Sequence, residues 1–239
     1  MKNENNNLRI ALRDGISIGV GYLAASFAFG ISATSAGLSV WQAVLVSLLN
    51  LTSAGQLAAV PILAAQGSLL ELALTQLVIN SRYSLMSVSL SQRFADSVRF
   101  RDRFWIGFGN TDEIFAVASS GNEPRGRRYF LCLIIPAVIG WVLGTALGAT
   151  SGELLPTIVV TALSVAIYAM FIAIVVPVAK CHLGTLLCVL AAAVCSSLFH
   201  YLPLLSGLPS GFVIVILAVV ISALFALLFP ISPEGEEGV

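Results

Sequence analysis

Long apolar segments, interrupted by very few charges, constrain the fold of this chain more than any other feature. They recur from Gly15 to Phe229, and 58% of the 239 residues are hydrophobic while 10% are charged. The mean hydropathy is +0.96. A transmembrane helix needs about 20 apolar residues to cross a hydrocarbon core of about 30 Å. The sequence therefore predicts an all-α, polytopic membrane protein embedded in a lipid bilayer.

Seven apolar segments are long enough to span the membrane. They are residues 15–36, 41–65, 69–91, 129–150, 156–178, 183–200 and 209–229. An eighth segment, 104–119, reaches only about 24 Å at about 1.5 Å per residue, and its centre is polar. We expect six to seven spanning helices plus one or two re-entrant or broken segments. The expected organisation is a cytoplasmic segment (1–14), one transporter domain (15–231) and an acidic, disordered tail (232–239).

Loop charges indicate the orientation, because Lys and Arg favour the cytoplasmic side. The basic loops are the amino-terminal segment, 93–103 and 125–128, whereas the loops near 37–40, 151–155 and 201–208 carry no Lys or Arg. If segment 41–65 is re-entrant, six crossings place every basic loop and both termini in the cytoplasm. If it crosses fully, seven crossings place the amino terminus outside, at the cost of three misplaced basic residues. The charges favour the first arrangement, so we expect both termini to be cytoplasmic. In both arrangements 104–119 dips in from the cytoplasmic side, and a bacterial inner membrane is the expected location.

Composition and motifs argue against several functional classes. The formal net charge is zero, and no basic run suggests nucleic-acid binding. No Ser/His/Asp set, HExxH motif or phosphate loop indicates an enzyme. The four cysteines are Cys132, Cys181, Cys188 and Cys195. They contain no CxxC pair, so we expect them to be small residues at helix contacts and expect no metal or cofactor.

The first polar position lies in the middle of segment 41–65, at Thr52 to Gln56. Small and hydroxyl residues loosen a helix there, and a broken helix is tolerated only where it faces protein or a water-filled cavity. The free N–H groups at the start of a half-helix would suit a substrate carboxylate. Ser53, Gly55 and Gln56 are therefore candidate substrate-binding residues. The alternative is a packing face of small residues.

The second polar position is a stripe on segment 69–91. It comprises Gln76, Asn80, Tyr83 and Ser87, which follow helical spacing. Arg82 lies near the middle of the segment, and its guanidinium keeps its charge and needs a partner or water. A guanidinium also matches a carboxylate in a bidentate way. Asn80, Arg82 and Tyr83 are candidate substrate-binding residues, and a structural ion pair with an acidic residue of 104–119 is the alternative.

The third polar position is the pair Asp112 and Glu113 in the short segment. Crowded carboxylates favour protonation of one of them, which would suit a coupling proton or contact with an ammonium group. The alternative is a solvated turn in which Asp112 caps a helix. Other ionisable residues lie near the ends of segments and are expected to reach water at the interface: Glu71, Glu153, Lys180, His182 and His200.

Six short motifs follow one another between Arg13 and Ser119. They are Arg13-Asp14-Gly15, Phe27-Ala28-Phe29-Gly30, Ala36-Gly37-Leu38-Ser39, Ser53-Ala54-Gly55-Gln56, Asn80-Ser81-Arg82-Tyr83 and Thr111-Asp112-Glu113. Each motif alone is weak. Their order and spacing, on a chain of this length, resemble the AzlC-like permeases, the large subunits of branched-chain amino acid exporters.

This resemblance implies export of branched-chain and similar small apolar amino acids together with a small AzlD-like membrane subunit. Members of that family often have His after the Asn-x-Arg element, where this chain has Tyr83, which can donate a hydrogen bond. We interpret the chain as a permease in which Arg82 and the broken segment hold the substrate carboxylate, while Asp112 and Glu113 hold its ammonium group or a coupling proton. The alternatives are a non-transporting membrane assembly subunit and a passive channel for small solutes.

Overall fold

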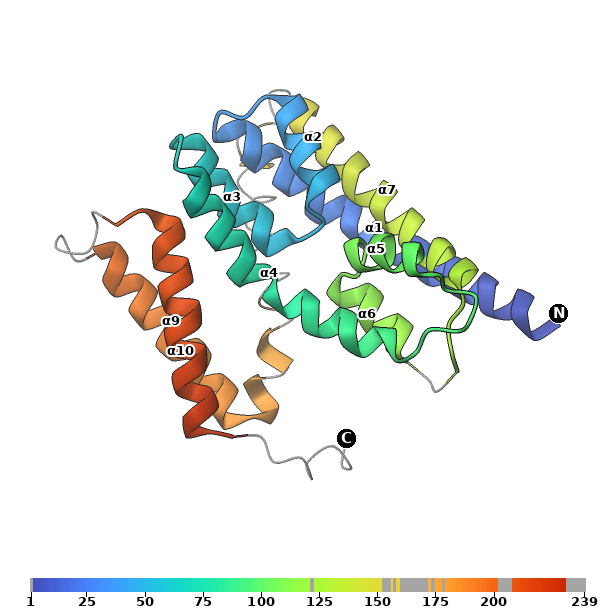
Figure 1. Ribbon diagram of the computed structural model, residues 1–239. Helices are drawn as coiled ribbons and strands as arrows, with labels where there is room; N and C mark the ends of the chain where they lie inside the picture. The colour runs from blue at the N-terminus through green and yellow to red at the C-terminus, as the bar shows by residue number, and fades with distance from the viewer. Residues whose placement is uncertain are drawn as a thin grey trace. The chain divides into compact units, whose positions relative to one another are not determined.

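The computed structural model describes residues 2–120, 123–151, 179–201 and 208–230, together with 156, 158, 159, 172 and 175–177. Within these residues every regular element is a helix, as predicted (Figure 1). The helices are α1 (Lys2–Ser35), α2 (Val40–Leu49), α3 (Ser53–Ala64), α4 (Leu69–Ser91), α5 (Phe100–Phe108), α6 (Asp112–Ser119), α7 (Arg127–Ser151), α9 (Leu183–Tyr201) and α10 (Ser210–Leu228).

Four helices in the described part of the chain are long and apolar enough to cross a bilayer: Asn7–Ser35 of α1, then α7, α9 and α10. The expected count of six to seven is not confirmed. Most of segment 156–178 lies outside the described residues, as does the tail 232–239. Helix α4 has 23 residues, which is long enough to span, but it carries Glu71 and Arg82 and is not one of these four helices. Helix α1 begins at Lys2, well before the apolar segment that starts at Gly15.

Both segments that were expected to be broken or re-entrant are broken. Segment 41–65 forms α2 and α3, of 10 and 12 residues, separated at Asn50–Thr52. These halves reach about 15 and 18 Å at about 1.5 Å per residue, roughly half a bilayer each. Segment 104–119 contains the second half of α5, which begins at Phe100, and all of α6; the two helices are separated at Gly109–Thr111. A new helix start therefore lies inside each apolar segment.

The chain divides into two units. The first unit takes in α1, α2, the first part of α3, α4 from Asn80 onward, and α5, α6 and α7. The second takes in Pro61–Ile79 together with α9 and α10.

Helices α1 and α7 lie side by side and form the main contact of the first unit (Figure 1). Small residues make this close approach possible. The glycines at the contact are Gly15, Gly19 and Gly30 on α1 and Gly140, Gly144 and Gly148 on α7. A Cβ atom built on Gly19 would lie 2.5 Å from the Pro136 carbonyl oxygen. Next to these glycines the rings of Tyr22 and Trp141 pack edge to face, with centroids 5.0 Å apart. We call this contact the α1–α7 seam.

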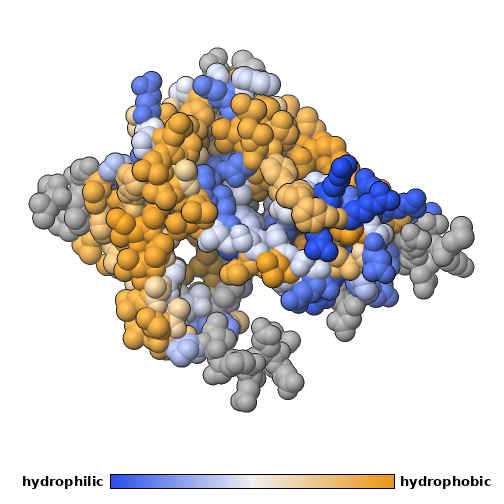
Figure 2. Space-filling view, viewed as in Figure 1, coloured by the Kyte–Doolittle hydropathy of each residue, from blue (hydrophilic) through white to orange (hydrophobic). Residues whose placement is uncertain are grey.

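The outer face of α7 presents apolar side chains instead of small ones. Ile135, Ile139, Leu143 and Leu147 are each 49–51% exposed and recur every fourth residue, so they form one stripe along the helix. Apolar side chains likewise cover much of the surface visible in Figure 2. An apolar surface on this scale requires lipid or a protein partner. Together with the four long apolar helices, it indicates that the protein is embedded in a membrane.

Candidate functional site

Gln56 closes the break between α2 and α3. It lies in the first turn of α3 and its side chain is fully buried, at 0% exposure. Its Nε2 donates to the Asn50 carbonyl at 2.7 Å and to the Ser47 hydroxyl at 3.1 Å. The Ser47 and Thr145 hydroxyls are 2.6 Å apart, which ties the break to α7. The end of a helix leaves carbonyls without intrahelical donors, and Gln56 supplies one of the missing donors.

The remaining polar atom of this network is the Gln56 side-chain oxygen. Oε1 is buried and has no hydrogen-bond partner within the described part of the chain. Because the Nε2 donor already serves Ser47 and Asn50, what Gln56 can still offer is an acceptor. An acceptor suits an N–H donor such as a substrate ammonium group, and it does not suit the carboxylate expected from the sequence.

Arg82 and Asp112 form a bidentate ion pair between α4 and the first residue of α6. Arg82 Nη2 lies 2.7 Å from Asp112 Oδ2, and Nη1 donates to Oδ1 at 2.9 Å. The two side chains are 45% and 31% exposed, so the pair is not fully buried. Tyr83 lies beside it: its hydroxyl accepts a hydrogen bond from Arg82 Nη2 at 3.1 Å, and the guanidinium carbon is 4.8 Å from its ring centre. The sequence had suggested this pair as the structural alternative to substrate binding.

Glu113 has a different partner from its neighbour Asp112. Tyr22 Oη lies 2.5 Å from Glu113 Oε2 and 2.6 Å from the Thr111 hydroxyl. A tyrosine hydroxyl carries one proton, so it donates to the charged carboxylate and accepts from Thr111. The two adjacent carboxylates therefore do not form a dyad that shares one proton between them. Each is held by a separate donor on another helix.

Asn110 lies in the break between α5 and α6 and connects it to the polar stripe of α4. It is buried, and its Nδ2 donates to the Ser87 hydroxyl at 3.2 Å. Its Oδ1 has no hydrogen-bond partner among the described residues. The break between α5 and α6 thus contains a second buried acceptor, similar to Gln56 Oε1.

The structure places the predicted site residues in two networks of the first unit. Arg82, Tyr83, Asp112 and Glu113 belong to one, and Gln56 belongs to the other. Ser53 is the first residue of α3, Gly55 donates its N–H to the Thr52 hydroxyl at 3.0 Å, and Asn80 lies on α4 one turn before Tyr83.

Sequence reasoning missed the residues that anchor these networks to the α1–α7 seam. They are Tyr22 on α1, Ser47 on α2 and Thr145 on α7. Tyr22 carried a detectable signal, because a tyrosine within an apolar helix usually finds a partner for its hydroxyl when it is buried. Ser47 and Thr145 carried none, since small hydroxyl residues are common in membrane helices for packing alone.

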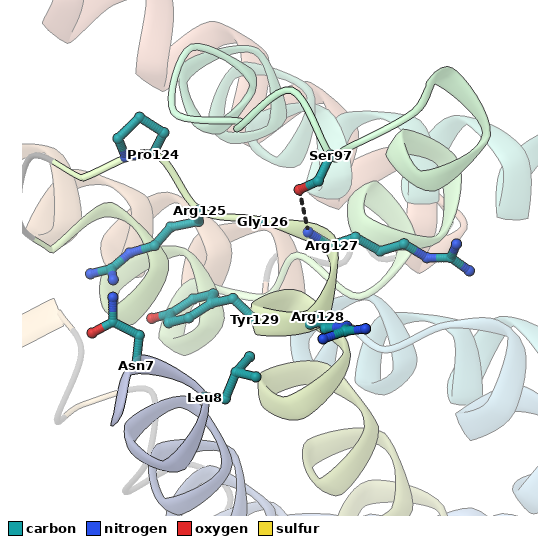
Figure 3. Close-up of a pocket in the computed structure, with 9 residues that line it drawn as sticks. All are labelled: Asn7, Leu8, Ser97, Pro124, Arg125, Gly126, Arg127, Arg128 and Tyr129. Carbon is teal, nitrogen blue, oxygen red and sulfur yellow. Dashed lines mark hydrogen bonds between the residues drawn. The ribbon is translucent and has the colours of Figure 1, made fainter. Parts of the chain in front are cut away.

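A basic cavity of about 470 Å³ lies at the amino end of α7 (Figure 3). Its lining residues are Asn7, Leu8, Ser97, Pro124, Arg125, Gly126, Arg127, Arg128 and Tyr129. The Arg125 guanidinium carbon is 4.6 Å from the centre of the Tyr129 ring, and the Ser97 hydroxyl accepts from the Arg127 backbone N–H. Three guanidinium groups suit an anion better than a zwitterion, and the lining includes none of the predicted substrate-binding residues.

Asp102 braces the basic loop beside this cavity. Its carboxylate accepts from the Arg99 backbone N–H at 2.9 Å and from the Trp105 indole at 3.1 Å. Arg127 Nε lies 3.2 Å away. The Arg99 amide, the Trp105 indole and the Arg127 guanidinium together hold the pKa of the Asp102 carboxyl below its ordinary value.

Comparison with known proteins identifies the family. Residues 17–155 match the family model described as AzlC protein, a range that contains the residues of both networks. The chain belongs to the AzlC family. The resemblance indicated by the sequence motifs is thereby confirmed.

Similar proteins in this family are membrane proteins. The chain is 32% identical over 145 residues to Inner membrane protein YgaZ of Escherichia coli (strain K12), covering 59% of each chain. It is 33% identical over 158 residues to an uncharacterized membrane protein of Archaeoglobus fulgidus, covering 65% of this chain and 68% of the relative. The match thus spans less than two thirds of YgaZ. No solved structure matches the chain.

Proposed function

We propose that this AzlC family member is a permease that exports branched-chain and similar small apolar amino acids, coupled to protons and working with a small AzlD-like membrane subunit. The observation that carries the proposal is the ion pair between Arg82 and Asp112, which is bidentate and partly exposed. Ionisable groups in a membrane protein are expensive, and they usually mark a pathway for substrate or ions.

The geometry of the ion pair matches an amino acid zwitterion. The substrate carboxylate can take the place of the Asp112 carboxylate on the Arg82 fork, since both are planar and accept two parallel hydrogen bonds. The released Asp112 then binds the substrate ammonium group. Each charge exchanges one partner for another of the same kind, so no charge is left uncompensated during binding.

The surrounding groups fit the same arrangement. The Tyr83 hydroxyl and ring hold the guanidinium in place when Asp112 leaves it. Glu113, held by Tyr22, is a second carboxylate for the ammonium group or for a proton. In this proposal the substrate side chain lies against apolar residues, and one methylene contributes only about 1–3 kcal/mol, so valine, leucine and isoleucine should compete for one site.

Counterflow of labelled isoleucine in proteoliposomes, with and without a co-expressed small subunit, tests the proposal. We expect saturable exchange that leucine and valine compete for and that Arg82→Ala abolishes. Arg101→Ala, which removes an exposed arginine outside both networks, is the matched control and should retain exchange. If Arg82→Ala and Asp112→Asn both transport normally as folded proteins, the site is not at this ion pair.

Other outcomes would favour the alternatives. Flux that does not saturate would indicate a channel, and no exchange in either preparation of folded protein would indicate an assembly subunit. The double variant Arg82→Asp with Asp112→Arg separates structure from binding. A purely structural pair survives this swap, whereas a site that orients a zwitterion loses exchange because both charges are reversed in place.

A further inference from the structure

Glu71 is a buried carboxylate that neither network uses. Its position near the end of an apolar segment predicted an interfacial side chain that reaches water. This prediction is wrong, because Glu71 is only 5% exposed in the structure. It lies in the first turn of α4, and the start of α10 covers it within the second unit.

The carboxylate of Glu71 holds the amino-terminal end of α10. Its Oε1 accepts from the Gly211 backbone N–H at 2.8 Å. The first N–H groups of a helix lack intrahelical acceptors and carry partial positive charge, so a negative carboxylate is favourable there. The side chain fits because both neighbours are glycines: a Cβ on Gly211 would lie 2.8 Å from Oε1, and one on Gly67 would lie 3.0 Å from Oε2.

Within the described residues no cation forms an ion pair with Glu71. The acidic residues in ion pairs there are Asp14, Asp102 and Asp112. The contacts of Glu71 that the structure gives are with Gly67, Ser68 and Gly211, and none of these residues titrates. His200 and Tyr201 end the helix that precedes α10, and no hydrogen bond or ion pair of the described chain joins either of them to Glu71.

Thr75 provides a second, independent observation at the same place. It is fully buried, one helical turn after Glu71 on α4, and its hydroxyl has no hydrogen-bond partner among the described residues. Its Oγ1 lies 2.6 Å from the position that a Gly211 Cβ would occupy, which is also 2.8 Å from Glu71 Oε1. A buried hydroxyl without a partner is unfavourable, so Thr75 is a second uncompensated polar group beside the start of α10.

We propose that Glu71 is a proton-binding site, whose charged form fastens the amino-terminal end of α10 and whose protonated form releases it. A proton removes the negative charge that favours the helix start. Glu71 differs from Asp112 and Glu113, which have side-chain partners in Arg82 and Tyr22. Coupling of this proton to transport rests on the proposed export function, whereas the protonation-dependent hold on α10 does not.

Hydrogen–deuterium exchange of the full-length protein in lipid nanodiscs tests the hold on α10 without any transport assay. The readout is protection of a peptide that begins α10, measured from pH 5 to pH 8 and corrected for the intrinsic pH dependence of exchange. We expect protection to fall about tenfold on acidification, because a hydrogen bond to a charged acceptor is stronger than one to a neutral acceptor.

Two variants and one control define the outcome. Glu71→Gln keeps the size and an acceptor oxygen, and should show low protection at every pH. Glu71→Asp keeps a titratable group and should retain a pH-dependent step. Glu123→Gln, which removes an exposed carboxylate, should behave like the wild type. A wild type without the pH-dependent step, or a Glu71→Gln variant that keeps it, would overturn the proposal.

A transport assay then tests the coupling. Isoleucine flux into proteoliposomes is compared with and without an imposed pH gradient, alongside counterflow at equal pH. Glu71→Gln should retain counterflow and lose acceleration by the gradient; retained acceleration would refute coupling through Glu71. If the wild type shows no isoleucine transport at all, the export function fails and coupling fails with it, while the exchange experiment still decides whether Glu71 binds a proton.

Discussion

The α1–α7 seam can be tested with two identical substitutions on one helix. Gly19 and Gly21 are two residues apart on α1, and they differ in what a new methyl group would meet. At Gly19 a Cβ would lie 2.5 Å from the Pro136 carbonyl oxygen and 3.1 Å from its carbonyl carbon. At Gly21 nothing lies within 4 Å. Gly19→Ala therefore forces the two helices apart, whereas Gly21→Ala adds a methyl group to an open surface.

The difference in the free energy of unfolding between the two variants can be estimated, because the gain in helix propensity is the same in both. Replacing Gly by Ala inside a helix stabilises it by about 0.5–1 kcal/mol, and this gain is common to both variants. Overpacking a close contact costs about 1–3 kcal/mol, and the obstacle at Gly19 is main chain, which cannot rotate away as a side chain would. Gly19→Ala should thus have a free energy of unfolding about 1–3 kcal/mol lower than Gly21→Ala.

Thermal unfolding in a mild detergent, followed by size-exclusion chromatography or tryptophan fluorescence, measures this difference. For a domain of this size 1 kcal/mol corresponds to about 2–4 °C, so the two melting temperatures should differ by about 2–12 °C, with Gly19→Ala the lower. Tyr22 lies in the same helix, and so the displacement should also weaken isoleucine exchange. Equal melting temperatures, or a higher one for Gly19→Ala, would refute the close contact between α1 and α7.

Two further substitutions test the buried network and the basic loop. Gln56→Leu removes the hydrogen bonds that Gln56 donates to the Asn50 carbonyl and the Ser47 hydroxyl, so we expect about 1–3 kcal/mol of destabilisation by thermal unfolding. Gln92→Leu, at an exposed position, should change stability little. The pKa of the Asp102 carboxyl is lower in the folded protein than in the unfolded chain. Below about pH 4 the unfolded chain therefore binds more protons than the folded protein does. The stability that Asp102 contributes is lost as the pH falls from there through the folded pKa. Asp102→Asn should remove this acid-dependent loss in melts recorded from pH 3 to pH 6, and an unchanged acid dependence would assign the loss to other carboxylates.

The positions of the helix breaks could be predicted from the sequence, because their causes are local. Hydroxyl and small residues at Thr52 to Gly55, and the polar residues after Gly109, interrupt apolar segments at those places. The structure begins α3 at Ser53 and α6 at Asp112, within the predicted regions. Arg82 and an acidic residue of the short segment could also be paired in advance, since a membrane protein contains few ionisable residues that could satisfy each other.

Long-range partners among common residue types could not be predicted in the same way. Tyr22 and Glu113 are 91 residues apart, and Glu71 and Gly211 are 140 apart. Nothing in the apolar pattern of α1 or α10 indicates which helix will lie beside it. Glu71 illustrates the consequence. Its position near the end of an apolar segment predicted exposure, whereas a helix from the far end of the chain buries it.

Several polar groups of these networks lie where helices begin, and this explains why structure and function are hard to separate here. Gln56 lies in the first turn of α3, Asp112 and Glu113 begin α6, and Glu71 lies in the first turn of α4 against the start of α10. A helix that starts inside an apolar segment exposes backbone groups that water cannot reach, so it needs polar side chains for stability. The same groups are what a zwitterion or a proton would bind.

Alanine at such a position removes the contribution to stability and the contribution to binding together. Glu71→Gln keeps the size of the side chain and removes its charge, and the reciprocal exchange of Arg82 and Asp112 keeps an ion pair while reversing its polarity. Both substitutions can therefore distinguish binding from folding better than alanine can.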